Sequence, residues 1–239
     1  MGVSLDLIIV IATYNERQSL PKLVEAIWEY LPKAKILVVD DNSPDGTGRW
    51  VKQAALSEPR MELLHREAKN GLGVATLAGI QQALKQNPTW VATMDADLSH
   101  RPEDLAKLWT AAVADHVDVL IGSRYVDGGR IENWSLARRS ASRLVNGFAR
   151  WVLWLPTRDN SSALRMYRAK TLETLALPAL DCRGYAYLEQ ILLHLKRVKA
   201  RIDEVPIVFT DRIEGESKVS FGEVFRNLRD IFWLALRRR

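Results

Sequence analysis

The sequence predicts an α/β fold, a single domain with a mostly parallel central sheet covered by helices on both faces. Three observations predict it. Short apolar runs alternate with helix-like stretches through the first half of the 239 residues, which is typical of parallel sheets. These runs end in polar or acidic residues, as strands do where their carboxyl ends border a ligand crevice. Apolar residues make up 47% of the chain, which is enough for a buried core.

Five strands and four helices are expected to alternate in the first 122 residues. The expected strands are Leu5–Ala12, Ile36–Val39, Met61–Leu64, Trp90–Met94 and Val117–Ile121. The expected helices are Ser19–Tyr30, Thr47–Leu56, Leu72–Gln86 and Pro102–Ala114. Because the carboxyl ends of such strands meet at one crevice, the motifs TYNE, DDNSPDGT and DADLSH should converge there.

The second half is expected to extend the same domain, because no Gly/Ser-rich linker and no internal repeat sets it apart. We expect helices over Ala137–Leu155 and Glu189–Lys199, and a strand over Arg201–Phe209 that is interrupted at Pro206. The last expected element is a helix over Phe221–Leu236.

Composition and missing motifs narrow the class of protein. The formal net charge is +5, which suits nucleic acid, phosphate ligands or anionic lipid equally. Cys182 is the only cysteine, so an intrachain disulfide and a cysteine-built zinc site are excluded, and a reducing cytosolic setting is expected. No run of about 20 apolar residues predicts a membrane span. A P-loop motif is absent, and Thr76 stands where a dinucleotide fingerprint needs its third glycine.

Asp95 and Asp97 are the strongest candidates for a metal site. They follow an apolar strand one residue apart, and an extended chain would aim both carboxylates into the crevice. A divalent cation with oxygen ligands, Mg²⁺ or Mn²⁺, would relieve their repulsion. The alternative is a solvated loop in which the aspartates cap a helix. Ser99 is either a weak third ligand or the cap of the next helix.

The ends of the first two strands carry candidate nucleotide contacts. Asp41 can accept hydrogen bonds from a base or a ribose, whereas Asp45 suits the turn before the next helix. Tyr14 can lie against a base, and Glu16 can pair with base or ribose donors. The alternative for this segment is a helix entry capped by Asn15.

Basic residues of the second half are candidate phosphate ligands. Arg124 follows the fifth strand, Arg138 opens the helix after it, and Arg212 and Lys218 lie in DRIEGESK. Guanidinium groups match phosphate geometry, and lysine supplies a point charge. Carboxylates for a metal beside cations for phosphates suit a nucleoside diphosphate leaving group.

Seven blocks then carry a family resemblance: TYNE, DDNSPDGT, REAKNGLG, MDADLSHRPED, GSRYVDGG, RMYR and DRIEGESK. In this order they resemble family 2 glycosyltransferases of the GT-A fold, and most of all the dolichol- or polyprenol-phosphate mannosyltransferases. The resemblance implies metal-dependent, inverting transfer of mannose from GDP-mannose to a polyprenyl phosphate. It also implies a catalytic domain over residues 1–220, with a nucleotide-binding half (1–122) and an acceptor-binding half (123–220), followed by an amphipathic helix (221–239).

Matching motifs transfer the family's roles to residues of this chain. The nucleoside would be held by Ala12, Tyr14, Glu16, Val39 and Asp41. The metal and diphosphate would be held by Asp95, Ala96 and Asp97. Arg124 and Arg138 would bind phosphate, and Arg212 and Lys218 would close over the donor. The resemblance implies Asp97, Arg124 and Arg138 as the catalytic residues.

Two departures from the family pattern leave the substrate open. Ala12 stands where the family usually has proline, and Ser162–Leu164 depart from its usual run. A rival interpretation is transfer of glucose or N-acetylglucosamine from a UDP-sugar. A sugar nucleotidyltransferase would need a Gly-rich loop after the first strand, which TYNERQSL lacks. A non-catalytic basic protein of membrane surfaces would leave the aspartates unexplained, and no pattern for nucleic-acid binding stands out.

The expected last helix combines an apolar stripe with arginines, as helices at membrane interfaces do. The helix over Ala137–Leu155 places four arginines beside Trp151 and Trp154 and could lie at the same interface. Both stripes could instead be ordinary core. The hypothesis is a protein held peripherally on the cytoplasmic face of an anionic membrane, with or without an anchoring partner protein.

Overall fold

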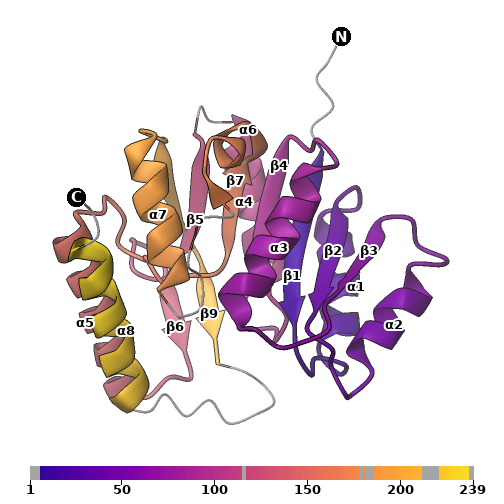
Figure 1. Ribbon diagram of the computed structural model, residues 1–239, viewed down its shortest axis with the longest axis horizontal. Coiled ribbons are helices and arrows are strands. Elements are labelled where there is room, and N and C mark those ends of the chain that lie inside the picture. The colour runs from indigo at the N-terminus through magenta and orange to yellow at the C-terminus, as the bar shows by residue number, and fades with distance from the viewer. Residues whose placement is uncertain (1–5, 115–116, 178–179, 181–185, 212–220, 237–239) are drawn as a thin grey trace.

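Seven strands form the central sheet of the computed structural model, which describes residues 6–114, 117–177, 180, 186–211 and 221–236. Their order is β3-β2-β1-β4-β7-β5-β8 (Figure 1). Their bounds are Leu7–Thr13 (β1), Lys35–Asp40 (β2), Met61–His65 (β3), Trp90–Asp95 (β4), Val119–Ser123 (β5), Arg165–Arg168 (β7) and Ile202–Pro206 (β8). β7 runs antiparallel to β4 and β5, and the other neighbours pair in parallel. The predicted mostly parallel sheet is confirmed.

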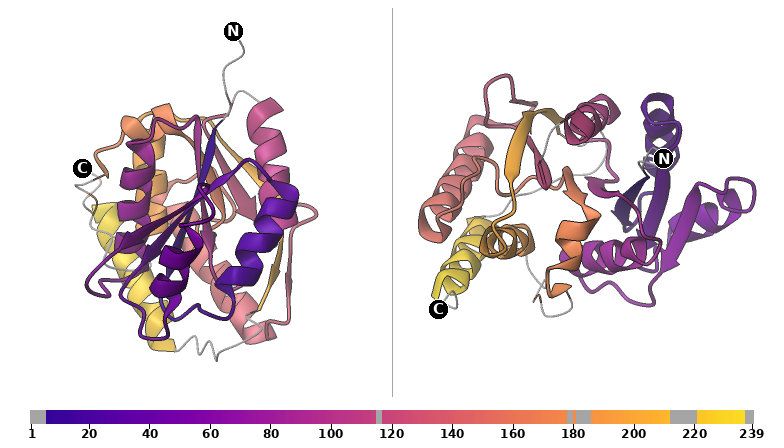
Figure 2. Two further views of the ribbon diagram at one scale, coloured as in Figure 1. Left: turned by 90° about the vertical axis from the view of Figure 1, so that its right-hand side faces the viewer. Right: turned by 90° about the horizontal axis from the view of Figure 1, so that it is seen from above.

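Helices cover both faces of the sheet (Figure 2). Their bounds are Leu20–Tyr30 (α1), Thr47–Ala54 (α2), Leu72–Leu84 (α3), Pro102–Ala114 (α4), Leu136–Leu153 (α5), Ala169–Glu173 (α6), Tyr187–Arg197 (α7) and Phe221–Leu236 (α8). Successive residues of β1 point to opposite faces, so Ile8 and Val10 pack under α3, α5 and α7, whereas Ile9 and Ile11 pack under α1 and α4. Burial on both faces explains why β1 reads as a continuous apolar run.

The strand expected over Arg201–Phe209 is in fact two strands in different sheets. β8 ends at Pro206, which has no N–H to continue the ladder, and β9 (Val208–Thr210) pairs with β6 (Arg130–Glu132) in a small second sheet. Between them, the Ile207 amide donates to the Ser123 carbonyl at 3.0 Å. The chain therefore turns away from the main sheet just past the carboxyl end of β5.

β6, β7 and α6 are absent from the predicted elements. They are three to five residues long, and β7 reads RMYR, which has no apolar alternation. Arg165 of β7 is nevertheless fully buried, and its guanidinium donates to the carbonyls of Asn160, Ser162 and Leu188. These bonds fasten the first turn of α7 to the segment before β7.

α8 lies against α5 at the edge of the molecule, to the left in Figure 1. Ile231 on α8 is fully buried, while Phe225, Phe232 and Trp233 are at least half exposed. The helix thus has one face in the core and another facing outward. Among the described residues, none of the helices is long and apolar enough to span a bilayer.

Candidate functional site

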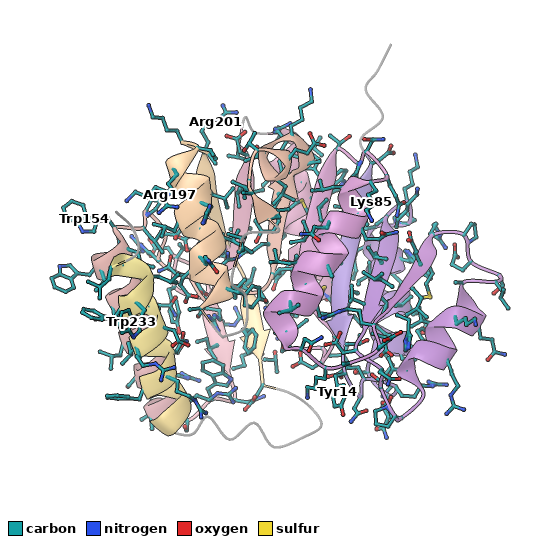
Figure 3. The ribbon with its side chains drawn as sticks, in the orientation of Figure 1. Tyr14, Lys85, Trp154, Arg197, Arg201 and Trp233 are labelled. Atoms are coloured by element: carbon teal, nitrogen blue, oxygen red, sulfur yellow. The ribbon has the colours of Figure 1, made fainter. Side chains whose placement is uncertain are left out.

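Four strands bring their carboxyl ends to one edge of the sheet. β1 ends at Thr13, β2 at Asp40, β4 at Asp95 and β5 at Ser123. In the sheet register, Ala12 lies opposite Val39 on one side and Asp95 on the other. The sheet topology thus brings the motifs TYNE, DDNSPDGT and DADLSH to the same edge, as predicted. Tyr14, at the lower edge in Figure 3, marks this end of the molecule.

Hydrogen bonds join the loops after β1 and β2. The Asp45 carboxylate accepts from the amides of Arg17 and Thr47, at 2.9 Å each, so it serves the turn as expected. The Ser43 hydroxyl accepts from the Asn15 amide at 3.0 Å. Because α1 begins at Leu20, Asn15 does not cap a helix. The joined loops hold the candidate nucleoside contacts in place.

Tyr14 and Asp41 both lie beside basic residues that the sequence analysis did not single out. Lys69 Nζ sits 3.8 Å from the centre of the partly exposed Tyr14 ring. Asp41 is nearly buried and pairs with Arg66 Nη1 at 2.8 Å. Burial raises the pKa of Asp41, and the Arg66 charge opposes that rise. Both predicted contacts therefore lie on a mixed-charge surface beside the β2 edge.

Glu16, another nucleoside candidate, is half-buried. Its carboxylate accepts from the Ser19 hydroxyl at 2.6 Å, and its amide donates to the Thr47 hydroxyl at 3.0 Å. These bonds fix the backbone of the β1–α1 loop.

Asp95 and Asp97 flank a buried alanine at the end of β4. Ala96 is 4% exposed, whereas both carboxylates reach the surface in part. Asp97 Oδ1 accepts from the Ser99 amide at 3.1 Å and from its hydroxyl at 2.5 Å. α4 begins at Pro102 and its first carbonyl acceptor is Arg101, so Ser99 does not cap that helix. Its role as a metal ligand stays a prediction.

His100 completes this corner of the site. It is 1% exposed, neither ring nitrogen has a hydrogen-bond partner, and Nδ1 lies 3.6 Å from Asp95 Oδ2. Burial lowers the pKa of His100 to about 4, so the ring is neutral at physiological pH. Its face meets Phe209 of β9 edge-on at 5.1 Å. A neutral imidazole thus lies beside the Asp95 carboxylate.

The donor set at the end of β4 fits a hard divalent cation. Two carboxylates stand together, and an imidazole nitrogen without a partner lies beside one of them. Within the described residues, no group of three or more His, Cys, Asp and Glu side chains is arranged to hold a metal alone. Mg²⁺ and Mn²⁺ sites that work on nucleotides use one or two carboxylates and take further oxygens from phosphates.

Arg124 is held in place by a buried ion pair with Asp159. Its Nε and Nη2 each lie 2.7 Å from a carboxylate oxygen of Asp159, and its backbone amide donates to the same group at 3.0 Å. Burial opposes both charges, but mutual attraction keeps the pKa of Arg124 raised and that of Asp159 lowered. The prediction placed Arg124 correctly past β5 but missed its partner.

Arg138 meets Arg124 across two aromatic rings. Arg138 stacks 4.0 Å from the centre of Trp134, and Arg124 lies 5.7 Å from the same ring. Phe209 packs edge-on against Trp134 at 5.5 Å and lies 5.3 Å from Arg124. Arg138 Nη1 also contacts both carboxylate oxygens of Asp211 at 2.8 Å. Arg212 and Lys218, which follow in the chain, lie outside the described residues.

A chain of contacts therefore joins the acidic and basic parts of the site. It runs from Asp95 through His100 and Phe209 to Trp134 and the two arginines. His100, Phe209 and Trp134, which link the two parts, were not among the predicted site residues. His100 stood next to DADLS and Phe209 ended the strand expected over Arg201–Phe209, but no local pattern joined them to each other or to Trp134, which follows β6.

Comparison with known proteins gives one consistent answer. The sequence model described as glycosyl transferase family 2 matches residues 8–176. The chain is 41% identical over 218 residues to a polyprenol monophosphomannose synthase of Mycolicibacterium smegmatis, covering 91% of this chain and 82% of that protein. It is 40% identical over 215 residues to an undecaprenyl-phosphate mannosyltransferase of Micrococcus luteus, covering 90% of this chain and 88% of that protein.

A solved structure supports the fold. A mannosyltransferase from Pyrobaculum calidifontis, in complex with GDP-Man and Mn²⁺, superposes with a TM-score of 0.64 at 18% identity. The likeness covers 97% of this chain and 64% of the larger archaeal chain. The predicted GT-A fold is thereby confirmed. The family match and the two relatives over most of their length together establish that this chain belongs to glycosyl transferase family 2.

Proposed function

We propose that this chain transfers mannose from GDP-mannose to the phosphate of a polyprenyl lipid. The observation that carries the proposal is about 40% identity, over nine-tenths of the chain, to two enzymes whose names join mannose to a polyprenyl phosphate. The site geometry supports it. Two carboxylates suited to a metal–diphosphate stand at the end of β4, and two arginines suited to a second phosphate stand across Phe209 and Trp134.

The acceptor needs no strong general base. A phosphate monoester is already anionic near neutral pH, so its oxygen can attack the anomeric carbon directly. Arg124, locked by Asp159, and Arg138 orient that phosphate for in-line displacement with inversion. Arg138 contacts Asp211, so an incoming phosphate competes with that carboxylate for the guanidinium. Positioning of the two substrates is the main work of these side chains.

Asp95 and Asp97 would hold a divalent ion, Mg²⁺ or Mn²⁺, and Ser99 is the predicted third contact. When bound, such an ion stabilises negative charge on the departing diphosphate. His100 supports the site by backing Asp95 with a neutral ring. Ala12 lies between Val39 and Asp95 in the sheet, where the backbone can line the nucleoside, with Tyr14 and Asp41 following Ala12 and Val39 in the chain.

The outward faces of α5 and α8 expose apolar side chains, as expected of an enzyme that works on a lipid acceptor. Exposed apolar side chains there are Leu144, Trp151, Trp154, Phe225, Phe232, Trp233 and Leu236. Trp154 and Trp233 point outward on the same side of the molecule (Figure 3). Such a surface supports peripheral attachment to a membrane, or docking of an anchoring partner protein. Attachment to the cytoplasmic face is part of the proposal.

Donor choice is tested by transfer of radiolabelled sugar into an organic-extractable product. Purified chain is incubated with polyprenyl phosphate, with Mn²⁺ or a chelator, and with GDP-mannose, UDP-glucose or UDP-N-acetylglucosamine. Chelator-sensitive transfer from GDP-mannose alone is expected. Transfer from a UDP-sugar alone would overturn the donor and direct attention to Ser162–Leu164. No transfer from any donor by folded protein would overturn the acceptor.

A further inference from the structure

A pocket opens between α5 and the segment that follows β5. It has a volume of about 360 Å³ and lies between α5, the segment after β5, and Arg158. Arg143, Gly147 and Arg150 line it from α5, and Tyr125 and Arg124 lie on the opposite side. Arg138 does not line this pocket, whereas Arg124, the other arginine proposed for the acceptor phosphate, does.

The rim of the pocket carries more positive than negative charge. Arg143 and Arg150 stand seven residues apart, which places them two turns apart on one helix face, with Gly147 between them. Both are exposed, and neither forms an ion pair within the described part of the chain. Arg158 is half exposed, its Nη1 lies 3.9 Å from the fully exposed Asp127 carboxylate, and its backbone amide donates to the Glu204 carboxylate at 2.7 Å. Three guanidinium groups therefore surround one opening.

The floor of the pocket is polar but already satisfied. Arg124 Nε and Nη2 donate to the Asp159 carboxylate, and the Tyr125 hydroxyl bonds to the Ser142 hydroxyl at 2.7 Å. Buried Asn146 uses its amide on the Ser142 carbonyl and the Ser161 hydroxyl. The floor thus supplies shape, and the rim arginines supply the attraction for an anion.

Exposed apolar side chains stand directly beside the basic rim. Leu144 follows Arg143, Trp151 follows Arg150, and the two apolar residues are 62% and 78% exposed. Because each residue turns the helix by 100°, the apolar row lies next to the basic row along α5. Trp154 at the end of α5 and the neighbouring outer face of α8 extend the apolar surface (Figure 3). A helix in a membrane interface has this arrangement, with apolar groups among acyl chains and arginines at the level of the phosphates.

We propose that this pocket binds the phosphate headgroup of an anionic phospholipid. The inference rests on the peripheral membrane attachment proposed above and adds the residues that select the lipid. A soluble phosphate ligand would not need the apolar row. Arg150 lies twelve residues beyond Arg138, about 18 Å along the helix, so one phosphate cannot contact both arginines. Arg124 lines the pocket, but its Nε and Nη2 are held by Asp159, so the headgroup is assigned to Arg143, Arg150 and Arg158.

Vesicle sedimentation tests whether Arg143 and Arg150 attract the anionic headgroup. Vesicles of phosphatidylcholine alone, or with phosphatidylglycerol, are mixed with wild type, with the double variant Arg143→Gln/Arg150→Gln, and with Lys52→Gln/Lys85→Gln. The control pair removes the same charge from exposed positions on α2 and just after α3, far from α5 (Figure 3 labels Lys85). Binding to phosphatidylglycerol vesicles should weaken about thirtyfold in the arginine variant and less than about threefold in the control. Equal losses in both would overturn the proposal, because net charge alone would then explain the binding.

The pocket itself is tested at Gly147. A Cβ added there meets no atom within 4 Å, and either alanine or glutamine should favour the helix over glycine. Gly147→Ala leaves the pocket open, whereas Gly147→Gln fills its mouth without changing charge. Weaker binding of the glutamine variant than of the alanine variant is expected. Equal binding of the two would refute a pocket and leave a diffuse basic surface.

Two further arms separate the possible sources of the phosphate. Inorganic phosphate is added to the vesicle assay, with sulfate at equal ionic strength as the control. Full release of the protein from vesicles by phosphate, at concentrations where sulfate has no such effect, would indicate a soluble ligand and contradict the lipid. Transfer to a short-chain isoprenyl phosphate, measured without vesicles, should be unchanged in the arginine variant. A raised KM there would place the pocket in the acceptor site and overturn the proposal. Absence of transfer in wild type would refute the proposed function without affecting the vesicle result.

Discussion

Removing the Asp159 carboxylate should destabilise the fold through the Arg124 guanidinium that it leaves behind. The side chains are 0% and 5% exposed, and three hydrogen bonds from Arg124 end on this carboxylate. Removing one partner of a buried pair costs about 3–5 kcal/mol, because the remaining charge is buried without compensation. That is a large part of the roughly 5–15 kcal/mol that stabilises a domain.

Asp159→Asn, which preserves shape, is the perturbation, and urea unfolding followed by circular dichroism is the assay. For a domain of this size, the expected loss corresponds to a melting temperature lower by about 6–20 °C. Glu132→Gln is the matched control, because the Arg101–Glu132 pair is one-third exposed and should cost much less stability than the buried pair. An Asp159→Asn variant within about 1 kcal/mol of wild type would refute the reasoning.

The same pair predicts a pH dependence. Burial raises the pKa of Asp159, but Arg124 more than offsets it and holds the pKa below the ordinary 3.8. The carboxylate therefore stabilises the fold above pH 3.8, and this contribution is lost as pH falls through the lowered pKa. The difference between wild type and Asp159→Asn should be constant near neutral pH and shrink in acid. A difference that grows in acid would contradict the pairing.

Three further outcomes follow from single side chains. Burial raises the pKa of Glu189 to about 7, so wild type loses stability as the pH rises from 4.5 to 7 and this carboxyl ionises. In urea unfolding, Glu189→Gln should be more stable than wild type at pH 8, by up to about 3 kcal/mol, and equal to it at pH 4. His100→Asn keeps a nitrogen near Asp95, where Nδ1 now lies 3.6 Å away, whereas His100→Gln moves it to the Nε2 position. Mn²⁺ titration with GDP should give about tenfold weaker metal binding for glutamine and near-wild-type binding for asparagine. Tyr14→Ala should weaken GDP binding about tenfold in calorimetry, if a base stacks on the ring; an unchanged affinity would remove Tyr14 from the site.

The sheet could be predicted because its signal is local. β1, β2 and β4 are buried on both faces, so each reads as an apolar run bounded by polar residues. The topology then follows from the rule that parallel strands present their carboxyl ends together, and this placed Asp41, Asp95 and Asp97 at one edge.

The basic half of the site could be predicted only as separate residues. Arg124 and Arg138 stood out as arginines near strand and helix ends, but Asp159 lies 35 residues from Arg124 and no periodicity joins them. β7 was missed because its buried Arg165 is satisfied by backbone carbonyls, which no hydrophobic pattern reveals. α8 was predicted as either core or membrane interface; Ile231 is buried while neighbouring aromatic rings are exposed, and membrane contact of the exposed face stays a proposal.

The most direct test of the site is calorimetric binding of GDP-mannose with and without Mn²⁺. Wild type is compared with Asp97→Asn and with Asp203→Asn, an exposed control on β8. If the end of β4 holds the ion that receives the diphosphate, Mn²⁺ should strengthen binding at least about tenfold in wild type and in the control, and have little effect in Asp97→Asn. An undiminished Mn²⁺ effect in Asp97→Asn would contradict a metal site at the end of β4.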